Sequence, residues 1–203
     1  MIALLLIGNT HNNLSQEEKN LIRASAYRAL EKYQIVKLPY TNSDIIKNLY
    51  DTYFIRTFDL LALDLDKAQE YSVKIGGYGA VYYSTDLHRY LFFFNRNIPD
   101  DYLTWTFAAF IASVELDLIV PDELFKITEG NLYIDEFVLH FTAPDPILQK
   151  CGITSPLDIA NTCNIPFKYA RDKSRNLRKR FTITALDEYI KFLFRKFIDN
   201  IHN

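Results

Sequence analysis

The side chains that could bind a metal or attack a substrate are few in this chain, and they are scattered along it. The histidines are His11, His88, His140 and His202. Neither Cys151 nor Cys163 belongs to a CxxC or CxxC…HxxxH pattern, so the sequence holds no zinc-binding or redox motif. A thiol–imidazole pair of either cysteine with His140 is supported by composition alone. We favour the interpretation that both cysteines are small, partly buried residues with a structural role.

Other catalytic patterns are also missing. The glycine-rich stretch at residues 76–79, GGYG, lacks the Lys-Ser/Thr of a phosphate-binding loop and precedes a predicted strand. No GxSxG nucleophile motif occurs. The sequence therefore offers no complete set of catalytic residues.

One segment concentrates positive charge. Between Phe167 and Arg180 there are seven basic residues and one acid, although the net charge of the whole chain is −2. The candidate contacts for nucleic acid or a partner are Lys168, Arg171, Arg175, Arg178 and Lys179. The arginines recur at i, i+4 and i+7 and share a helix face that could follow a phosphate backbone. We prefer the alternative of a solvated face that balances the acidic remainder of the chain.

Composition places the chain among compact proteins of the cytoplasm. Its 203 residues are 49% hydrophobic and 15% aromatic, with only 6 glycines, which favours helices and a substantial core. Two lone thiols indicate a reducing compartment. The apolar run at residues 2–7 is too short for a signal peptide or a membrane span and has no basic residue before it.

The first half of the chain predicts alternating elements. Residues 2–7 and 34–40 have the pattern of short strands, and Ser15 with Glu18 forms a capping box that begins a helix. Another helix should begin near Ser43 or Asp44, whereas residues 51–75 are ambiguous, with helical spacing at 64–71. Residues 78–84 and 89–94 predict a β-hairpin.

The second half predicts helices. A helix should begin after Pro99 and run to about Leu118, and its apolar residues from 105 to 114 predict burial on every side. Further helices are expected at residues 132–142, after Ser155, and along the basic segment. A last helix from Thr184 carries an apolar stripe over residues 186–201, which must dock on the core or on another chain.

The order of these signals resembles the ImmA/IrrE family of metallopeptidases. The matching stretches are YLFFFN at residues 90–95, Pro99, WTFA at 105–108, YIDEFVLHFTAP at 133–144, SPLDIA at 155–160 and Ala170-Arg171. The resemblance implies a zincin-like fold, with a small sheet and a central buried helix, followed by a helix-turn-helix-like region. Members of this family cleave repressors of phages and integrative elements.

The chemistry of that family is missing. Zincin activity needs two histidines four residues apart, a glutamate that acts as general base, and a distal ligand. In register, Ala109 and Ser113 replace the two histidines, Phe110 replaces the general base, and Tyr133 replaces the distal glutamate. Glu115, Asp117 and His140 are the nearest possible substitutes, but their positions do not suit one shared metal. We expect no metal and no cofactor.

Together these observations predict an α+β protein with a degenerate zincin-like domain at residues 1–150. Residues 151–203 should form a helical region with a helix-turn-helix-like segment at 155–180. The predicted function is that of a catalytically inactive regulatory protein that binds a partner, such as a helix-turn-helix repressor. The alternatives are nucleic-acid binding through the basic helix at residues 166–180, and a metallopeptidase with non-standard ligands. No membrane partner is expected.

Overall fold

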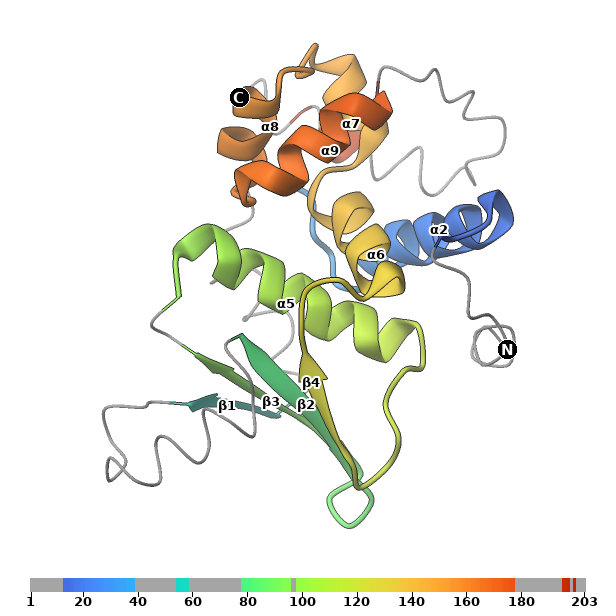
Figure 1. Cartoon of the computed structure of the whole chain (residues 1–203), viewed down its shortest axis with the longest axis vertical. Helices are drawn as coiled ribbons and strands as arrows, with labels where there is room; N and C mark the ends of the chain where they lie inside the picture. Colours follow the sequence, from blue (N-terminus) through green and yellow to red (C-terminus); the bar gives the residue numbers. More distant parts are fainter. Residues whose placement is uncertain are drawn as a thin grey trace.

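The chain forms one sheet layer covered by helices. The structure, a computed structural model, describes residues 13–38, 54–58, 78–95, 98–177, 195–197 and 199, with only the backbone at 54–58. The sheet lies at one end of the molecule, helix α5 crosses it, and the C-terminal helices lie at the other end (Figure 1). The predicted mixture of helices and a small sheet is thus confirmed at the level of an α+β protein.

The first described helix begins where the sequence predicts. Helix α2 (Gln16–Lys32) is preceded by Ser15, whose hydroxyl accepts a hydrogen bond from the Glu18 amide at 3.2 Å. The Glu18 carboxylate in turn accepts from the Ser15 amide at 2.7 Å, which completes the capping box. The inner face of α2 places Ile22, Ala26 and Leu30 in the core.

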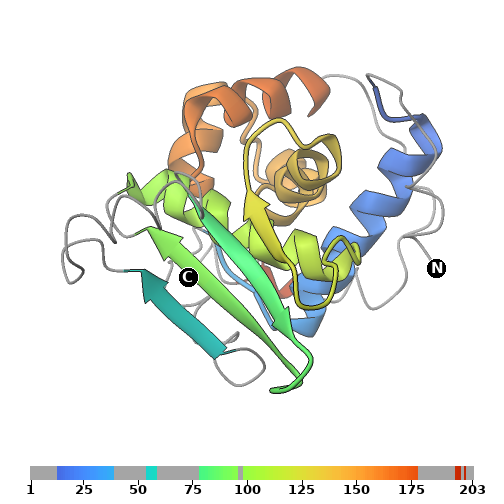
Figure 2. The same cartoon turned by 60° about the horizontal axis from the view of Figure 1, so that its bottom comes forward.

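The sheet is built around the predicted hairpin. Strands β2 (Gly79–Ser84) and β3 (Arg89–Asn95) pair antiparallel, and β4 (Leu124–Ile127) pairs antiparallel with β2. Strand β1 (Phe54–Phe58) runs parallel to β3, so the strand order is β1-β3-β2-β4 (Figure 2). We did not predict β4, because it is short and mostly exposed, so it shows no continuous apolar run.

Helix α5 (Asp100–Glu115) is the centre of the fold, as the sequence predicts. Every residue from Thr104 to Ser113 is buried. On the sheet side, the ring of Phe110 stacks on Phe92 with centroids 4.7 Å apart. Gly79 permits this approach, because a Cβ there would lie 2.9 Å from Phe110 Cζ and 2.4 Å from the Phe93 carbonyl oxygen.

Four further helices follow the sheet. They are α6 (Leu132–Thr142), α7 (Asp145–Lys150), α8 (Pro156–Cys163) and α9 (Phe167–Leu177). Three of them were predicted, whereas the six-residue α7 is too short to show a helical period. Asn164 ends α8 in the left-handed conformation (φ 50°), which turns the chain tightly into α9.

One predicted strand is wrong over its described part. The chain at residues 34–38 forms no strand: Gln34 has φ 52°, and the Ile35 amide donates to the Leu30 carbonyl of α2. Ile35 is nevertheless buried, so its hydrophobicity reflects core packing rather than sheet pairing. The predicted elements at residues 2–7, 43–44 and 64–71 lie outside the described residues.

A single hydrophobic core extends across the predicted boundary at residue 150. It contains Phe137 and Leu148 from one side of the boundary and Ile159 and Ala170 from the other. The helix predicted from Thr184 falls mostly outside the described residues, but residues 195–197 are helical and Phe197 is fully buried in the core. Within the described ranges, none of the helices has both the length and the apolar character of a membrane span.

The close approach at Gly79 gives a direct test of this packing. Gly79→Ala should lower the free energy of unfolding by about 3 kcal/mol, the upper end of overpacking costs, because the new methyl group meets backbone as well as a ring. Urea denaturation measures this change. The control is Gly130→Asn, where nothing lies within 4 Å and asparagine tolerates the positive φ. Equal effects of the two substitutions would contradict the packing described here.

Candidate functional site

The positions that the sequence resemblance aligns with the peptidase ligands are packed into the core. Ala109, Phe110 and Ser113 on α5 are each 0% exposed. The Phe110 ring lies against the sheet, and the Ser113 hydroxyl donates to the Phe110 carbonyl of its own helix at 2.8 Å. A metal with its bound water needs an open coordination position. These three buried side chains offer neither suitable ligands nor such an opening.

The remaining candidate ligands are engaged elsewhere. Tyr133 on α6 directs its hydroxyl to the Glu18 carboxylate of α2, at 3.4 Å. Glu115 accepts from Lys32 at 2.6 Å and from the Tyr33 hydroxyl at 2.7 Å. Among the described residues, no group of three His, Cys, Asp or Glu side chains could hold a metal ion. The alternative of a peptidase with substitute ligands therefore gains no support from these side chains.

The structure instead brings together a buried ionic group that the sequence analysis did not identify. We call Glu136, His140, Asp145 and Lys173 the ion cluster. Asp145 accepts from Lys173 Nζ at 2.8 Å, and its second oxygen lies 3.1 Å from His140 Nδ1. The other imidazole nitrogen, Nε2, lies 3.3 Å from Glu136 Oε1. The side chains of Lys173 and Asp145 are only 2% and 3% exposed.

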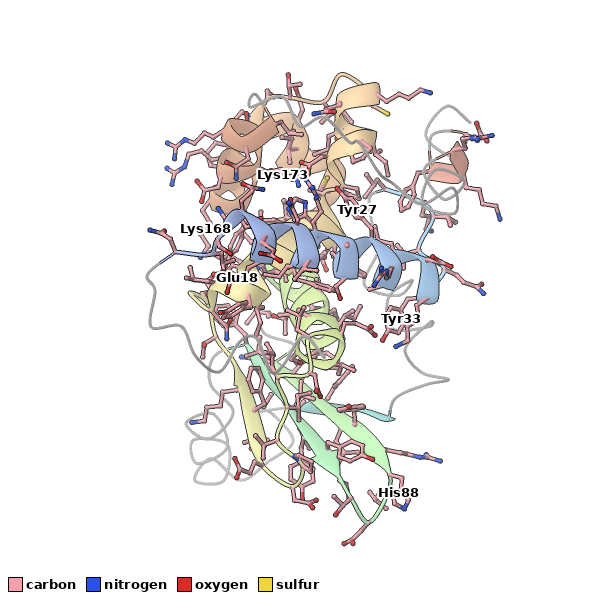
Figure 3. All side chains as sticks on the ribbon, turned by 90° about the vertical axis from the view of Figure 1, so that its right-hand side faces the viewer. Glu18, Tyr27, Tyr33, His88, Lys168 and Lys173 are labelled. Atoms are coloured by element: carbon pink, nitrogen blue, oxygen red, sulfur yellow. The ribbon has the colours of Figure 1, made fainter. Side chains whose placement is uncertain are left out.

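Three described helices supply the ion cluster, and a fourth covers it. Glu136 and His140 are four residues apart on α6 and therefore share one face of that helix. Asp145 begins α7 and Lys173 projects inward from α9. From α2, the Tyr27 hydroxyl lies 3.4 Å from Asp145 and its ring stands edge-on to His140. Figure 3 shows Tyr27 and Lys173 on the side of α2 that faces the C-terminal helices.

The imidazole of His140 can satisfy its neighbours in two ways. As an imidazolium it donates from Nδ1 to Asp145 and from Nε2 to Glu136, and the ion cluster then has no net charge. As a neutral ring it accepts at Nδ1 from Lys173, 3.3 Å away, and donates only to Glu136. Both arrangements fit the distances within the ion cluster.

The carboxyl groups of the ion cluster are held in their ionised forms. Burial by itself would raise the pKa of Asp145, but the Lys173 ammonium and the His140 hydrogen bond outweigh it and hold the pKa well below the ordinary value. At Glu136, burial also acts to raise the pKa, but the hydrogen bond with His140 helps to hold the pKa below its ordinary value. Burial raises the pKa of the Tyr27 hydroxyl well above its usual value, so Tyr27 remains a neutral neighbour.

A hollow opens above the ion cluster. It has a volume of ≈ 120 Å³ and is lined by all four cluster residues. Its remaining lining consists of Gln16, Lys19, Leu139 and Asn176. A concave site with ionised buried groups at its base is a functional-site candidate on physical grounds.

The thiol–imidazole pairing considered from composition gains no support at Cys163. Cys163 is fully buried, and burial raises the pKa of its thiol to about 12. A thiol with that pKa holds almost no nucleophilic thiolate at neutral pH. Cys163 therefore has the character of a small core residue.

Part of the predicted basic surface is used inside the protein. Lys173 belongs to the ion cluster. The Lys168 ammonium pairs with Glu129 and lies 5.4 Å from the Tyr102 ring centroid and 4.9 Å from that of Tyr169. These contacts fasten the start of α9 to α5 and to the chain after β4. The ammonium of Lys168 is thus shared among groups of the protein itself.

The exposed arginines of α9 have an acidic neighbour. Arg175 lies 3.4 Å from Asp172, and Arg171 Nε lies 4.0 Å from the same carboxylate. Both guanidinium groups remain largely exposed, so they are available to an outside partner. Arg178 and Lys179 lie outside the described residues. The helix–turn–helix sequence of α8, residues 164–166 and α9 is present, and its use for nucleic acid stays a prediction.

Two sequence signals could have indicated the ion cluster. Glu136 and His140 have the i, i+4 spacing of a helical pair, and Lys173 falls on the apolar side of an otherwise basic helix. Asp145 gave no such signal, because α7 was not predicted. The two stretches that meet here are more than twenty residues apart, and only packing brings α9 onto the end of α6.

Removing the charge of one member of the ion cluster should destabilise the folded protein. Asp145→Asn keeps the shape of the side chain but leaves Lys173 buried without its counter-charge, and should lower the free energy of unfolding at pH 7 by about 3–5 kcal/mol. The pKa of Asp145 is lowered on folding, so its contribution is present above its ordinary value of 3.8 and is lost as the pH falls further. The difference in free energy of unfolding between the wild type and Asp145→Asn should therefore become smaller in acid.

Denaturant unfolding between pH 3 and pH 7 measures this difference. The exposed carboxylate variant Asp172→Asn is the control and should change stability little at any pH. Adding Lys173→Met to Asp145→Asn should recover part of the loss, because the buried charge is then gone. If the losses in free energy of unfolding caused by Asp145→Asn and Lys173→Met simply added up in the double variant, the two side chains would not form a direct charge pair.

The contacts of Lys168 predict a smaller loss of stability, together with a change in tryptophan fluorescence. Lys168→Met should lower the free energy of unfolding by about 1 kcal/mol, since a partly exposed cation–π contact and ion pair are lost. Trp105, the single tryptophan, stacks on Tyr169 with centroids 5.8 Å apart, so its emission should shift. Lys150→Met, at the exposed end of α7, is the control. Unchanged emission and stability in Lys168→Met would show that the ammonium is not held as described.

Comparison with known proteins assigns no relative to this chain. Protein-family models, curated proteins and solved structures all gave no match. The likeness to the ImmA/IrrE family therefore remains an expectation from the order of the sequence motifs.

Proposed function

We propose that this chain is a catalytically inactive regulatory protein of the ImmA/IrrE type, which binds a partner protein without cleaving it. The partner expected from the sequence resemblance is a helix-turn-helix repressor of a phage or mobile element. The observation that carries the proposal is the complete burial of Ala109, Phe110 and Ser113 on α5. At the positions where the family holds its metal and general base, this chain has packing residues.

The physical argument concerns what such packing excludes. A hydrolytic zinc site needs ligands with lone pairs, a general base and space for water. Phe110 fills its position with a ring stacked on Phe92, and Ala109 has no donor atom. Restoring one histidine would also place a polar ring against the aromatic core. The site could not regain activity through a single substitution, which favours action by occupancy.

A candidate contact surface lies on the helix–turn–helix unit. Leu157 of α8 is 60% exposed and Phe167 at the start of α9 is 53% exposed. Arg171 and Arg175 extend from the same helix as Phe167. Apolar side chains beside exposed cations are typical of protein interfaces. This surface suits a folded partner with an apolar patch and acidic neighbours.

Nucleic-acid binding through α9 is the weaker candidate. Of the five basic residues proposed for it, Lys168 is held by Glu129 and two rings. Arg171 and Arg175 share the Asp172 carboxylate, which reduces their attraction for phosphate. The described side chains thus favour a protein partner.

The proposal predicts binding without cleavage and without zinc. Repressors encoded by the same genetic element should bind the purified chain in calorimetry and should stay intact on prolonged incubation. Leu157→Ser with Phe167→Ser should weaken binding by at least about tenfold, because two exposed apolar contacts are removed. Leu87→Ser is the matched control, since Leu87 is 59% exposed and belongs to the turn between β2 and β3, which lies at the opposite end of the molecule from α8 and α9 (Figure 1).

Elemental analysis of the same preparation addresses the catalytic alternative. Zinc should be far below one equivalent per chain, with a buffer blank for comparison. One equivalent of zinc, or a cleaved repressor, would overturn the inactive assignment. Intact protein that binds none of these repressors would overturn the proposed partner and leave the assignment of inactivity standing.

A further inference from the structure

The hollow above the ion cluster has the features of a built ligand site. Its base is the ion cluster, and its rim consists of Gln16 and Lys19 from α2, Leu139 from α6 and Asn176 from α9. Lys173 and Asp145 at the base are almost fully buried and hold each other in place. The polar base is therefore rigid, while the rim side chains can adjust to an occupant.

The size of the hollow limits the occupant to a very small molecule. Its volume is ≈ 120 Å³. A cavity of about 150 Å³ holds benzene, whereas drug-sized ligands occupy pockets of roughly 300–1,000 Å³. Nucleotides, sugars and peptide segments are too large to be enclosed. A molecule of about five to seven non-hydrogen atoms would fit.

The charges in the hollow limit the occupant further. Apart from the imidazole of His140, the ammonium groups of Lys19 and Lys173 face the carboxylates of Glu136 and Asp145. The balance is thus even, and an added ion would leave an uncompensated charge in a partly buried site. An occupant without net charge is favoured.

Two of these charges are left apart across the opening. Lys173 and Asp145 neutralise each other at the base. The Lys19 ammonium is near enough to contribute to the lowered pKa of Glu136, yet these two side chains form no ion pair among the described residues. An ammonium on α2 and a carboxylate on α6 therefore both face the hollow. A molecule with the opposite arrangement of charges would bridge them.

We propose that this hollow binds a small zwitterion, namely a free α-amino acid of the size of glycine, alanine or serine. Its ammonium group would lie against Glu136, and its carboxylate would lie against Lys19 and the Asn176 amide. Both contacts are charge-assisted hydrogen bonds, the strongest type available to such a ligand. Leu139 would contact the short side chain and disfavour larger ones.

The bound molecule would connect α2 to α6 and α9. No step of the proposed partner binding depends on it, because the exposed residues Leu157 and Phe167 do not line the hollow. Failure of either proposal would leave the other unaffected.

The test uses the full chain and follows the imidazole signals by heteronuclear NMR at constant ionic strength. The chain has 4 histidines, and His140→Gln assigns the signal of His140 by its disappearance. Glycine, L-alanine and L-serine should shift the His140 signal with saturation. Acetate, methylammonium and acetamide, which each carry part of the zwitterion's chemistry, should bind at least about tenfold more weakly.

Two variants locate the binding. Glu136→Gln retains an oxygen for the His140 contact but removes the charge, and Lys19→Met changes only the rim. Each should weaken glycine binding by about tenfold. Glu17→Gln on α2 and Lys150→Met on α7, which lie outside the hollow, should leave binding unchanged.

Several outcomes would overturn the proposal. They are the absence of a saturable shift up to about 100 mM glycine, equal binding of acetate or methylammonium, and unchanged binding in Lys19→Met. Because the Lys19 substitution leaves the ion cluster intact, it decides the question even if Glu136→Gln does not fold.

Discussion

The fold depends on the need to cover α5 on every side. Ten consecutive buried residues, Thr104 to Ser113, leave this helix no face that could contact water. The sheet covers one side through Phe92, and α6 with α2 covers the other. Near its first turns, the ring of Trp105 stacks on Tyr169 of α9. Each neighbouring element is therefore positioned by the apolar surface that α5 must bury.

The same requirement governs Ala109, Phe110 and Ser113, the positions that the sequence resemblance aligns with the ligands and general base of a peptidase. A catalytic helix keeps one face open to metal, water and substrate, so it cannot be covered completely. Here the helix is covered at all three positions, and Gly79 allows the Phe110 ring to reach the sheet backbone. This cover gains dispersion and hydrophobic burial for the side chains of α5.

The ion cluster supplies what apolar packing cannot, namely directionality between helices. Burying Lys173 and Asp145 costs desolvation energy that their attraction only partly recovers. Their hydrogen bonds, together with His140, nevertheless define how α9, α7 and α6 meet, since a shifted arrangement would leave a buried charge unpaired. The same four residues line the hollow beside the cluster.

The elements whose signals are local could be predicted from the sequence alone. The capping box at Ser15, the hairpin from residue 79 to residue 95 and the all-round apolar α5 each depend on neighbours a few residues away. The absence of metal-binding atoms at Ala109 and Phe110 is likewise visible in their residue types. By contrast, Ile35 was assigned to a strand, because hydrophobicity indicates burial but does not reveal which partner provides it.

The contacts between distant segments were decided only by the tertiary structure. Strand β4 exists because β2 offers an edge to pair with, and α7 is too short to show a period of its own. Lys168 and Lys173 belong to one basic run in the sequence, yet one is held between two tyrosine rings and the other lies in the ion cluster. Residue type and spacing specify which side chains share a helix face. Whether that face meets water, an aromatic ring or a buried carboxylate depends on how the helices pack, because burial and pairing are properties of the assembled core.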